Sequence, residues 1–106
     1  MSRVMRMLVL FDLPTGTPEE RHNYTLFRKF LIHEGFDMLQ YSVYCRITAN
    51  HDDSRKYLQR IKANLPPRGS VRLLLITEKQ YAAMQILLGN KTATENLLKD
   101  NDIVEL

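Results

Sequence analysis

Two apolar segments stand out along the 106-residue chain. Residues 4–11 form a nearly continuous apolar run that ends at Asp12 and Pro14, and residues 71–77 form a second one. Apolar runs of this length, closed by turn residues, are typical of buried strands. We therefore expect two strands here, of which the first is central in its sheet and covered on both faces.

Two amphipathic segments predict helices. The first begins after Thr17, where Pro18 suits the first helical position and Glu20 completes a capping box, and it ends at Gly35. The second begins at residues 51–54 and stops before residues 66–67, which are both proline. The apolar positions that recur at helical spacing are Tyr24, Phe27, Phe30 and Leu31 in the first, and Tyr57, Leu58, Ile61 and Leu65 in the second.

Residues 36–47 alternate with period two, and the apolar parity flips near Leu39 and Gln40. A flip predicts a tight turn or a bulge between two short strands. The order strand, helix, strand pair, helix, strand is that of an α+β sandwich of the ferredoxin-like βαββαβ type. Residues 77–80 form another capping box, so a short helix should follow, and residues 84–89 could extend it or form a fifth strand.

Length and composition allow one ferredoxin-like domain over residues 1–90 and a C-terminal tail over residues 91–106, whose end at 102–106 is β-prone. No apolar run approaches the ~20 residues needed to span a bilayer, so we expect no membrane partner. The only cysteine, Cys45, fits a small core residue of a cytoplasmic protein. Residues 1–90 carry a net charge of +5 (thirteen Lys and Arg, eight Asp and Glu), and residues 91–106 carry −2 (two against four). A basic body is compatible with nucleic acid, although an ordinary solvated surface explains it equally well.

Asp12 is the candidate for chemistry, because it directly follows the apolar run and a charge there needs a partner. One interpretation is that its carboxylate caps the turn over residues 14–17. The other is that it is a ligand for a hard cation such as Mg²⁺ (or Mn²⁺). One carboxylate makes a poor site, but two copies related by a two-fold axis would make a plausible one that activates water toward phosphate.

Three motifs carry a resemblance to a known family: Met7–Asp12 with the following Leu13–Thr15, then Gly35–Tyr44, and Thr77–Tyr81. In this order they resemble the CRISPR-associated Cas-two (Cas2) family over residues 3–90, in a form most similar to type II-A systems. The resemblance implies a ferredoxin-like homodimer built by packing two sheets. It also implies a fifth strand near Ile86 and a tail near Ile103 that completes the partner's sheet.

The resemblance further implies that Asp12 is the metal-binding catalytic aspartate. Family members are described as metal-dependent endonucleases that cut RNA or double-stranded DNA. They also form the central dimer between two Cas-one integrase dimers, where DNA is captured and inserted as new spacers. The chain departs from some ribonuclease-active relatives, which have an arginine where this chain has Met38 and Leu39 and an arginine pair where it has only Arg21. These departures count against RNA cleavage.

Two hypotheses follow. The first is a DNA-bridging subunit of CRISPR adaptation, whose expected contacts with duplex phosphates are Thr15, Thr17, Arg21, Arg28, Arg68 and Lys91. The second is a Mg²⁺-dependent phosphodiesterase in which Asp12 of both copies holds the metal. A toxin-like metal-dependent endoribonuclease is the alternative outside these two. A small RNA-binding domain is disfavoured, because the strands lack exposed aromatic pairs.

Overall fold

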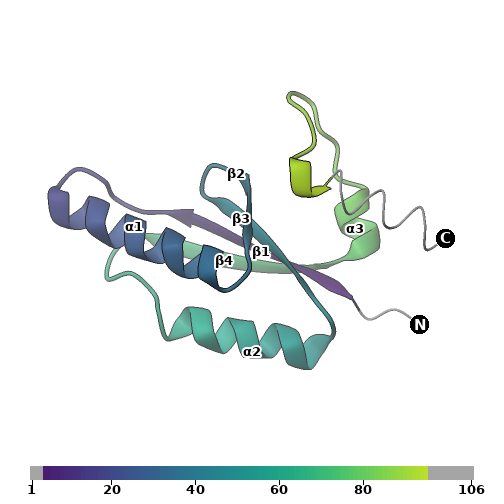
Figure 1. Ribbon diagram of the computed structural model, residues 1–106, viewed down its shortest axis with the longest axis horizontal. Coiled ribbons are helices and arrows are strands. Elements are labelled where there is room, and N and C mark those ends of the chain that lie inside the picture. Colours follow the sequence, from purple (N-terminus) through teal and green to yellow (C-terminus); the bar gives the residue numbers. More distant parts are fainter. Residues whose placement is uncertain (1–3, 96–106) are drawn as a thin grey trace.

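The computed structural model describes residues 4–95, and it confirms the predicted order of elements (Figure 1). The helices and strands are β1 (Met5–Asp12), α1 (Pro18–His33), β2 (Asp37–Gln40), β3 (Val43–Thr48), α2 (His51–Lys62), β4 (Ser70–Thr77) and α3 (Glu78–Ala82). The protein therefore has the α+β, ferredoxin-like βαββαβ arrangement that the sequence predicts, followed by the short helix expected from the capping box at Thr77.

The sheet has the strand order β2-β3-β1-β4, and its three strand pairs are antiparallel. β1 is central, as predicted, and pairs with β4 along its whole length, from Met5 opposite Thr77 to Asp12 opposite Ser70. This register brings the end of β1 and the start of β4 together at one end of the sheet.

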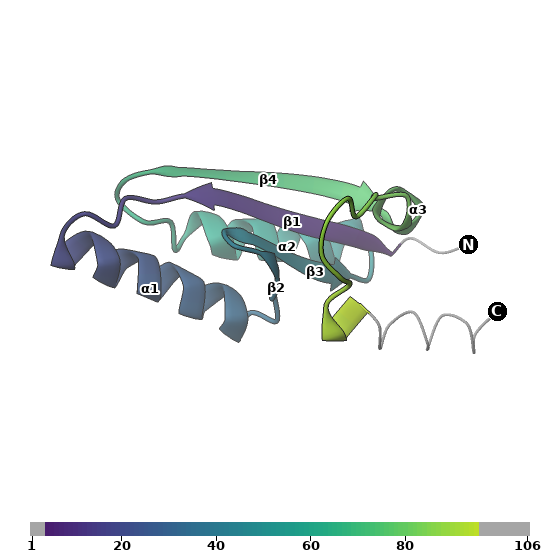
Figure 2. The same ribbon diagram turned by 90° about the horizontal axis from the view of Figure 1, so that it is seen from above.

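Both long helices pack on the same face of this sheet (Figures 1 and 2). The core between them combines alternate β1 residues with buried residues of α1, α2, β3 and the adjoining loops: Met7, Val9, Phe11, Leu13, Phe27, Leu31, Phe36, Tyr44, Tyr57 and Ile61. The β1 residues of opposite parity lie on the other face, and the side chain of Leu10 there is 38% exposed. On the neighbouring β4, Leu74 is 54% exposed. The expectation that β1 is covered on both faces is therefore wrong at Leu10 in a single copy of the chain.

The start of α1 follows the predicted capping signal, whereas α2 ends earlier than predicted. The Thr17 hydroxyl accepts a hydrogen bond from the Glu20 backbone N–H (3.1 Å), and the Glu20 carboxylate accepts one from the Thr17 N–H (3.0 Å). α2 ends at Lys62, so Leu65 lies beyond it and is 50% exposed. The prediction that Leu65 belongs to the buried stripe is wrong, because the helix stops before it.

The predicted parity flip in residues 36–47 is confirmed as both a turn and a bulge. Ser42 turns the chain with a φ of 62°, and the register shifts between Met38 and Gln40. The extra residue on β2 moves its side chains to the opposite face, which is the physical origin of the flip.

Gly35 and Arg46 hold the junction between α1 and β2. Gly35 has a φ of 87°, the left-handed backbone that favours glycine. The guanidinium of Arg46 donates from Nη1 to the Glu34 carbonyl (2.9 Å) and lies 4.0 Å from the centre of the Tyr57 ring. A Cβ on Gly35 would overlap Arg46 Nη1, so another residue there would displace the guanidinium.

Residues 84–90 do not form the fifth strand expected near Ile86. They are irregular, and they expose Met84, Ile86, Leu87 and Leu88. A strand needs a neighbour to pair its backbone groups, and in residues 4–95 neither edge strand, β2 or β4, pairs with these residues. The expected strand near Ile103 lies outside the described residues. Within residues 4–95, no helix combines the length and the hydropathy needed to cross a membrane.

Candidate metal and nucleic-acid site

Asp12 is the last residue of β1, and its side chain is exposed at the end of the sheet. Within residues 4–95 its carboxylate makes no hydrogen bond or ion pair, so the interpretation that it caps the turn over residues 14–17 is wrong. The turn is organised instead by Thr17 and Glu20, which satisfy each other. The Asp12 carboxylate is therefore available to bind a ligand from solution.

The loop before β4 packs closely on the backbone of Asp12. Gly69 has a φ of 106°, and a Cβ there would lie 2.7 Å from the Asp12 carbonyl oxygen and 2.8 Å from a methyl group of Leu13. Only glycine allows this approach, because the neighbouring atoms include backbone. Gly69 thus fixes the position of Arg68 beside the end of β1.

The loop between β1 and α1 brings further predicted residues to this end of the molecule. Arg21, in the first turns of α1, donates from Nη1 to the Thr15 carbonyl oxygen (3.1 Å). The Thr17 hydroxyl accepts from Glu20, which leaves its own O–H able to donate. A groove of about 380 Å³ separates this loop from the loop before β4. Its walls include Pro14, Thr17, Tyr24, Pro66, Pro67 and Arg68.

The structure thus gathers Asp12, Thr15, Thr17, Arg21 and Arg68 at one end of the sheet. Arg28 lies two turns along α1 from Arg21, and because seven residues make two helical turns it shares the same exposed side of the helix. Figure 2 shows α3 at the opposite end of the molecule from the start of α1. Lys91 follows α3 and precedes Thr92, which binds Glu95, the hydrogen-bond partner of Tyr81 in α3. A single copy therefore does not bring Lys91 to the Asp12 end.

One Asp12 is not a metal site by itself. In residues 4–95 no group of three or more His, Cys, Asp or Glu side chains could hold a metal ion. The exposed carboxylate has the oxygen chemistry that Mg²⁺ and Mn²⁺ prefer, but a single charged ligand from the protein satisfies too little of the ion's coordination. The residues fit a divalent cation only if a second Asp12 contributes.

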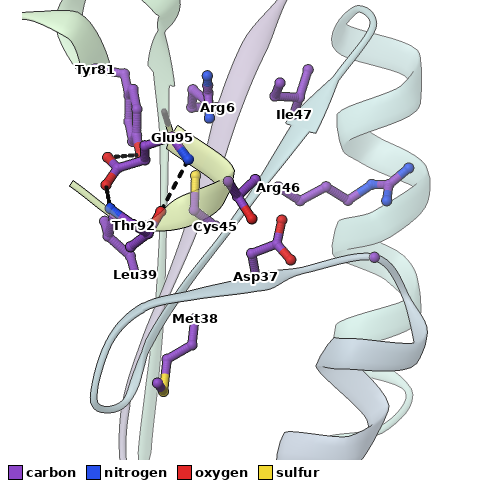
Figure 3. Close-up of a pocket in the computed structure, with 12 residues that line it drawn as sticks. Arg6, Asp37, Met38, Leu39, Cys45, Arg46, Ile47, Tyr81, Thr92 and Glu95 are labelled. Atoms are coloured by element: carbon purple, nitrogen blue, oxygen red, sulfur yellow. Dashed lines mark hydrogen bonds between the residues drawn. The ribbon is translucent and has the colours of Figure 1, made fainter. Parts of the chain in front are cut away.

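A second polar cluster lies at the other end of the sheet, around a cavity of about 230 Å³ (Figure 3). Arg6 forms an ion pair with Glu78, and its guanidinium lies 4.1 Å from the centre of the Tyr81 ring. The Tyr81 hydroxyl donates to Glu95 (2.5 Å), which also accepts from the Thr92 N–H (2.8 Å). These contacts attach residues 92–95 to α3.

The tyrosine and the cysteine at this second cluster, Tyr81 and Cys45, are poor nucleophiles. Burial raises the pKa of Tyr81, and the hydrogen bond to Glu95 raises it further. Burial also raises the pKa of Cys45, which lies beside Arg6. Both groups remain protonated at neutral pH, because an ordinary tyrosine or cysteine pKa already lies above 7. This agrees with Cys45 as a buried residue of the sheet rather than a catalytic thiol.

Comparison with known proteins decides the family. The family model described as CRISPR associated protein Cas2 matches residues 5–84. The chain belongs to the CRISPR-associated Cas2 family. It is 54% identical to a Cas2 of Acidovorax ebreus over 85 residues, which cover 80% of this chain and 83% of that protein. It is 48% identical to a Cas2 of Treponema denticola over 102 residues, which cover 96% and 100%, respectively. Both relatives are named CRISPR-associated endoribonuclease Cas2.

The Cas2 match includes the Asp12 end of the molecule but not Lys91, which lies beyond residue 84. It confirms the family that the three sequence motifs indicate. The pattern did not single out Arg72, an exposed arginine within the apolar strand β4. Its signal was available in the sequence, because residues 71–77 are otherwise apolar apart from the terminal threonine.

Proposed function

We propose that two copies of this Cas2 protein pack through the open face of the sheet, and that the dimer binds double-stranded DNA between two Cas-one integrase dimers during CRISPR spacer acquisition in the cytoplasm. The single observation that carries the proposal is the apolar sheet face that lies opposite α1 and α2. Family membership supplies the CRISPR context.

The sheet face opposite the long helices is unusual for a solvent-facing surface. An antiparallel sheet with one solvated face normally alternates apolar and polar residues. Here the side chains on that face include Leu8, Leu10, Val43 and Leu74, of which Leu10 and Leu74 are exposed. Of the polar residues on this face, Asp12, Ser70 and Arg72 lie toward one end of the β1–β4 pair. An exposed apolar patch bordered by polar residues usually marks an interface. A second copy of the same face would cover it symmetrically.

The basic residues near Asp12 suit contact with the phosphate backbone of a duplex. Arg28 and Arg68 are exposed and make no ion pair within residues 4–95, and Arg21 uses one nitrogen to bind Thr15. A two-fold axis would double this set, so a dimer presents twice the positive charge. Such contacts hold a duplex without reading its sequence, and their affinity falls steeply with salt.

The test mixes the protein with the integrase and labelled short duplexes and asks whether one stable complex forms. Leu74→Asp should abolish the dimer and the complex, because it places a charge on the apolar face. Leu65→Asp is the matched control, since Leu65 is 50% exposed but lies beyond α2. Sedimentation measures the dimer and circular dichroism the fold. A monomeric wild-type protein, or equal loss in both variants, would contradict the proposal.

We propose Mg²⁺-dependent phosphodiester hydrolysis as a second function of the same dimer. Two observations favour it: the exposed Asp12 carboxylate has no partner in the described chain, and the relatives are named endoribonucleases. The relatives' names make RNA the first substrate to examine, with double-stranded DNA as the other. Met38 and Leu39, which replace an arginine of some active relatives, are the residues that argue against RNA.

In this second function each residue has a definite task. A divalent cation would activate water and neutralise charge on the phosphate. Asp12 from both copies would hold the cation, and the basic residues beside it would hold the nucleic-acid backbone. Because the Asp12 carboxylate has no partner in the described chain, its replacement should leave the fold intact.

The test is cleavage of labelled RNA and duplex DNA by Asp12→Asn, with Asp52→Asn on α2 as the control for removal of one exposed carboxylate. Cleavage should disappear only in Asp12→Asn and should need Mg²⁺ or Mn²⁺. Unchanged cleavage in that variant would reject the Asp12 mechanism. Survival of spacer uptake in cells that carry Asp12→Asn would separate the bridging role from hydrolysis. Growth arrest on expression of the wild-type chain would instead favour a toxin-like ribonuclease.

A further inference from the structure

Arg72 and Asp12 are neighbours on the open face of the sheet. In the β1–β4 register, Asp12 lies opposite Ser70, and Leu10 lies opposite Arg72. Since alternate residues of a strand share a face, Asp12, Leu10, Ser70 and Arg72 all belong to the same face. Arg72 is therefore the diagonal cross-strand neighbour of Asp12, at a spacing of roughly 7–8 Å between such positions, within reach of a long side chain.

The guanidinium of Arg72 is available for a ligand. Arg72 is exposed, and within residues 4–95 its side chain makes no hydrogen bond, ion pair or ring contact. It does not pair with Asp12 in a single copy, although the two side chains carry opposite charges on the same surface. The exposed basic residue therefore stands among apolar residues of β4 with no internal contact to explain it.

The backbone of Arg72 is fixed by strand pairing, unlike that of the other basic residues at the Asp12 end of the sheet. Arg68 lies in a loop, and Arg21 is tied to the Thr15 carbonyl oxygen, whereas Arg72 lies within a strand that is paired along its length with β1. A site built on a strand keeps its geometry better than one on a loop. An arginine in such a position offers a planar pair of N–H donors that matches two oxygens of one phosphate group.

We propose that Arg72 and Asp12 form one phosphodiester-binding site, in which Arg72 binds the oxygens of the phosphate that lies beside the Asp12 carboxylate. The proposal rests on the proposed function, and it adds the residue that holds the reacting phosphate. Without a cation, Asp12 repels the phosphate and Arg72 supplies the compensating charge. In a dimer that packs through this face, two arginines accompany the two aspartates.

The test measures binding without metal, so that it does not depend on hydrolysis. A fluorescein-labelled short duplex and a labelled short RNA are titrated with the protein in EDTA at several KCl concentrations, and anisotropy gives the affinity. Arg72→Gln should weaken binding about tenfold. It should also reduce the salt slope, which is the slope of log affinity against log KCl concentration, by about one for each phosphate that the variant no longer neutralises. Arg72→Lys should restore the salt slope, because the charge returns. It should not restore the cleavage rate, because the paired donors are missing.

Arg55→Gln is the matched control. Arg55 is an exposed arginine of α2, on the helix-covered side of the sheet, where it pairs with Asp52 at 3.6 Å. This variant should bind and cleave as the wild-type protein does, and sedimentation should show that all variants remain dimers.

Three outcomes overturn the proposal. If Arg72→Gln binds as tightly as Arg55→Gln while the wild-type protein binds and cleaves, Arg72 has no role and the proposed function stands. If Arg72→Gln dissociates the dimer, Arg72 is an interface residue rather than a phosphate ligand. If the wild-type protein neither binds nor cleaves, the proposed function fails and the inference fails with it.

Discussion

Replacement of Gly35 by alanine should destabilise the protein far more than an ordinary surface substitution. The left-handed backbone at Gly35 (φ 87°) costs a residue with a Cβ about 1 kcal/mol. The new methyl group would also overlap Arg46 Nη1 and displace it. That guanidinium can move away, so the further cost is that of breaking its interactions: about 1.5–3 kcal/mol for the hydrogen bond to Glu34 and about 1 kcal/mol for the Tyr57 ring.

The expected destabilisation by Gly35→Ala is therefore about 3 kcal/mol or more, which would lower the melting temperature by at least about 12 °C. The assay is thermal unfolding followed by circular dichroism at fixed protein concentration. Gly89→Ala is the matched control, because Gly89 has a φ of 97° but nothing within 4 Å of a Cβ. It should lose only the backbone contribution, about 1 kcal/mol.

A second background isolates the role of Arg46. Arg46→Met already lacks the interactions with Glu34 and Tyr57, so Gly35→Ala should then cost about 1 kcal/mol, as in the control. Equal destabilisation by Gly35→Ala and Gly89→Ala, or an unchanged effect in the Arg46→Met background, would refute the reasoning. The expected result would explain a glycine of the family motif by the fold rather than by catalysis.

Three further substitutions test the remaining polar contacts. Asp53 accepts a hydrogen bond from the Ala49 N–H, which lowers the pKa of its carboxyl. Asp53→Asn should therefore lower the free energy of unfolding by about 0.5–1 kcal/mol at pH 7. Urea unfolding should show that the difference in stability between wild type and variant vanishes as the pH falls through that lowered pKa. Burial and the hydrogen bond to Glu95 raise the pKa of Tyr81 above the ordinary tyrosine value of about 10. Tyr81→Phe should therefore remove the component of the absorbance at 295 nm that titrates at the highest pH. An unchanged titration would contradict the hydrogen bond between Tyr81 and Glu95. Thr77→Ala removes the N-cap of α3 and should cost about 1 kcal/mol, with faster hydrogen exchange confined to that helix.

The local elements were predictable because their signals are local. The capping box at Thr17, the glycine at the end of α1 and the parity flip before β3 each act within a few residues, and each is confirmed. The wrong predictions concern where a helix ends and what covers each face of a strand. Leu65 has the helical spacing but lies past the end of α2, and Leu10 is apolar but faces away from the helices.

The candidate site was predictable only in part. The end of an apolar run identifies Asp12, and the loop and helix that follow bring Thr15, Thr17 and Arg21 to it. The sequence shows Arg72 as the one charged residue of an apolar strand, but not its closeness to Asp12, which depends on the register between strands that are far apart in sequence. The segment near Ile86 fails as a strand for a related reason, since the chain must supply a neighbour for its backbone groups.

β4 lies at the edge of the sheet, so hydrogen exchange of its backbone amides can show whether another molecule covers that edge. In an antiparallel edge strand, alternate amides point toward the neighbouring strand and the others point outward. The inward amides of residues 70–77 should exchange their hydrogens slowly in any folded form of the chain. The outward amides should slow only when another molecule shields that edge. A change from alternate protection to protection of all eight residues would thus show that the edge is covered, without a label or a substitution.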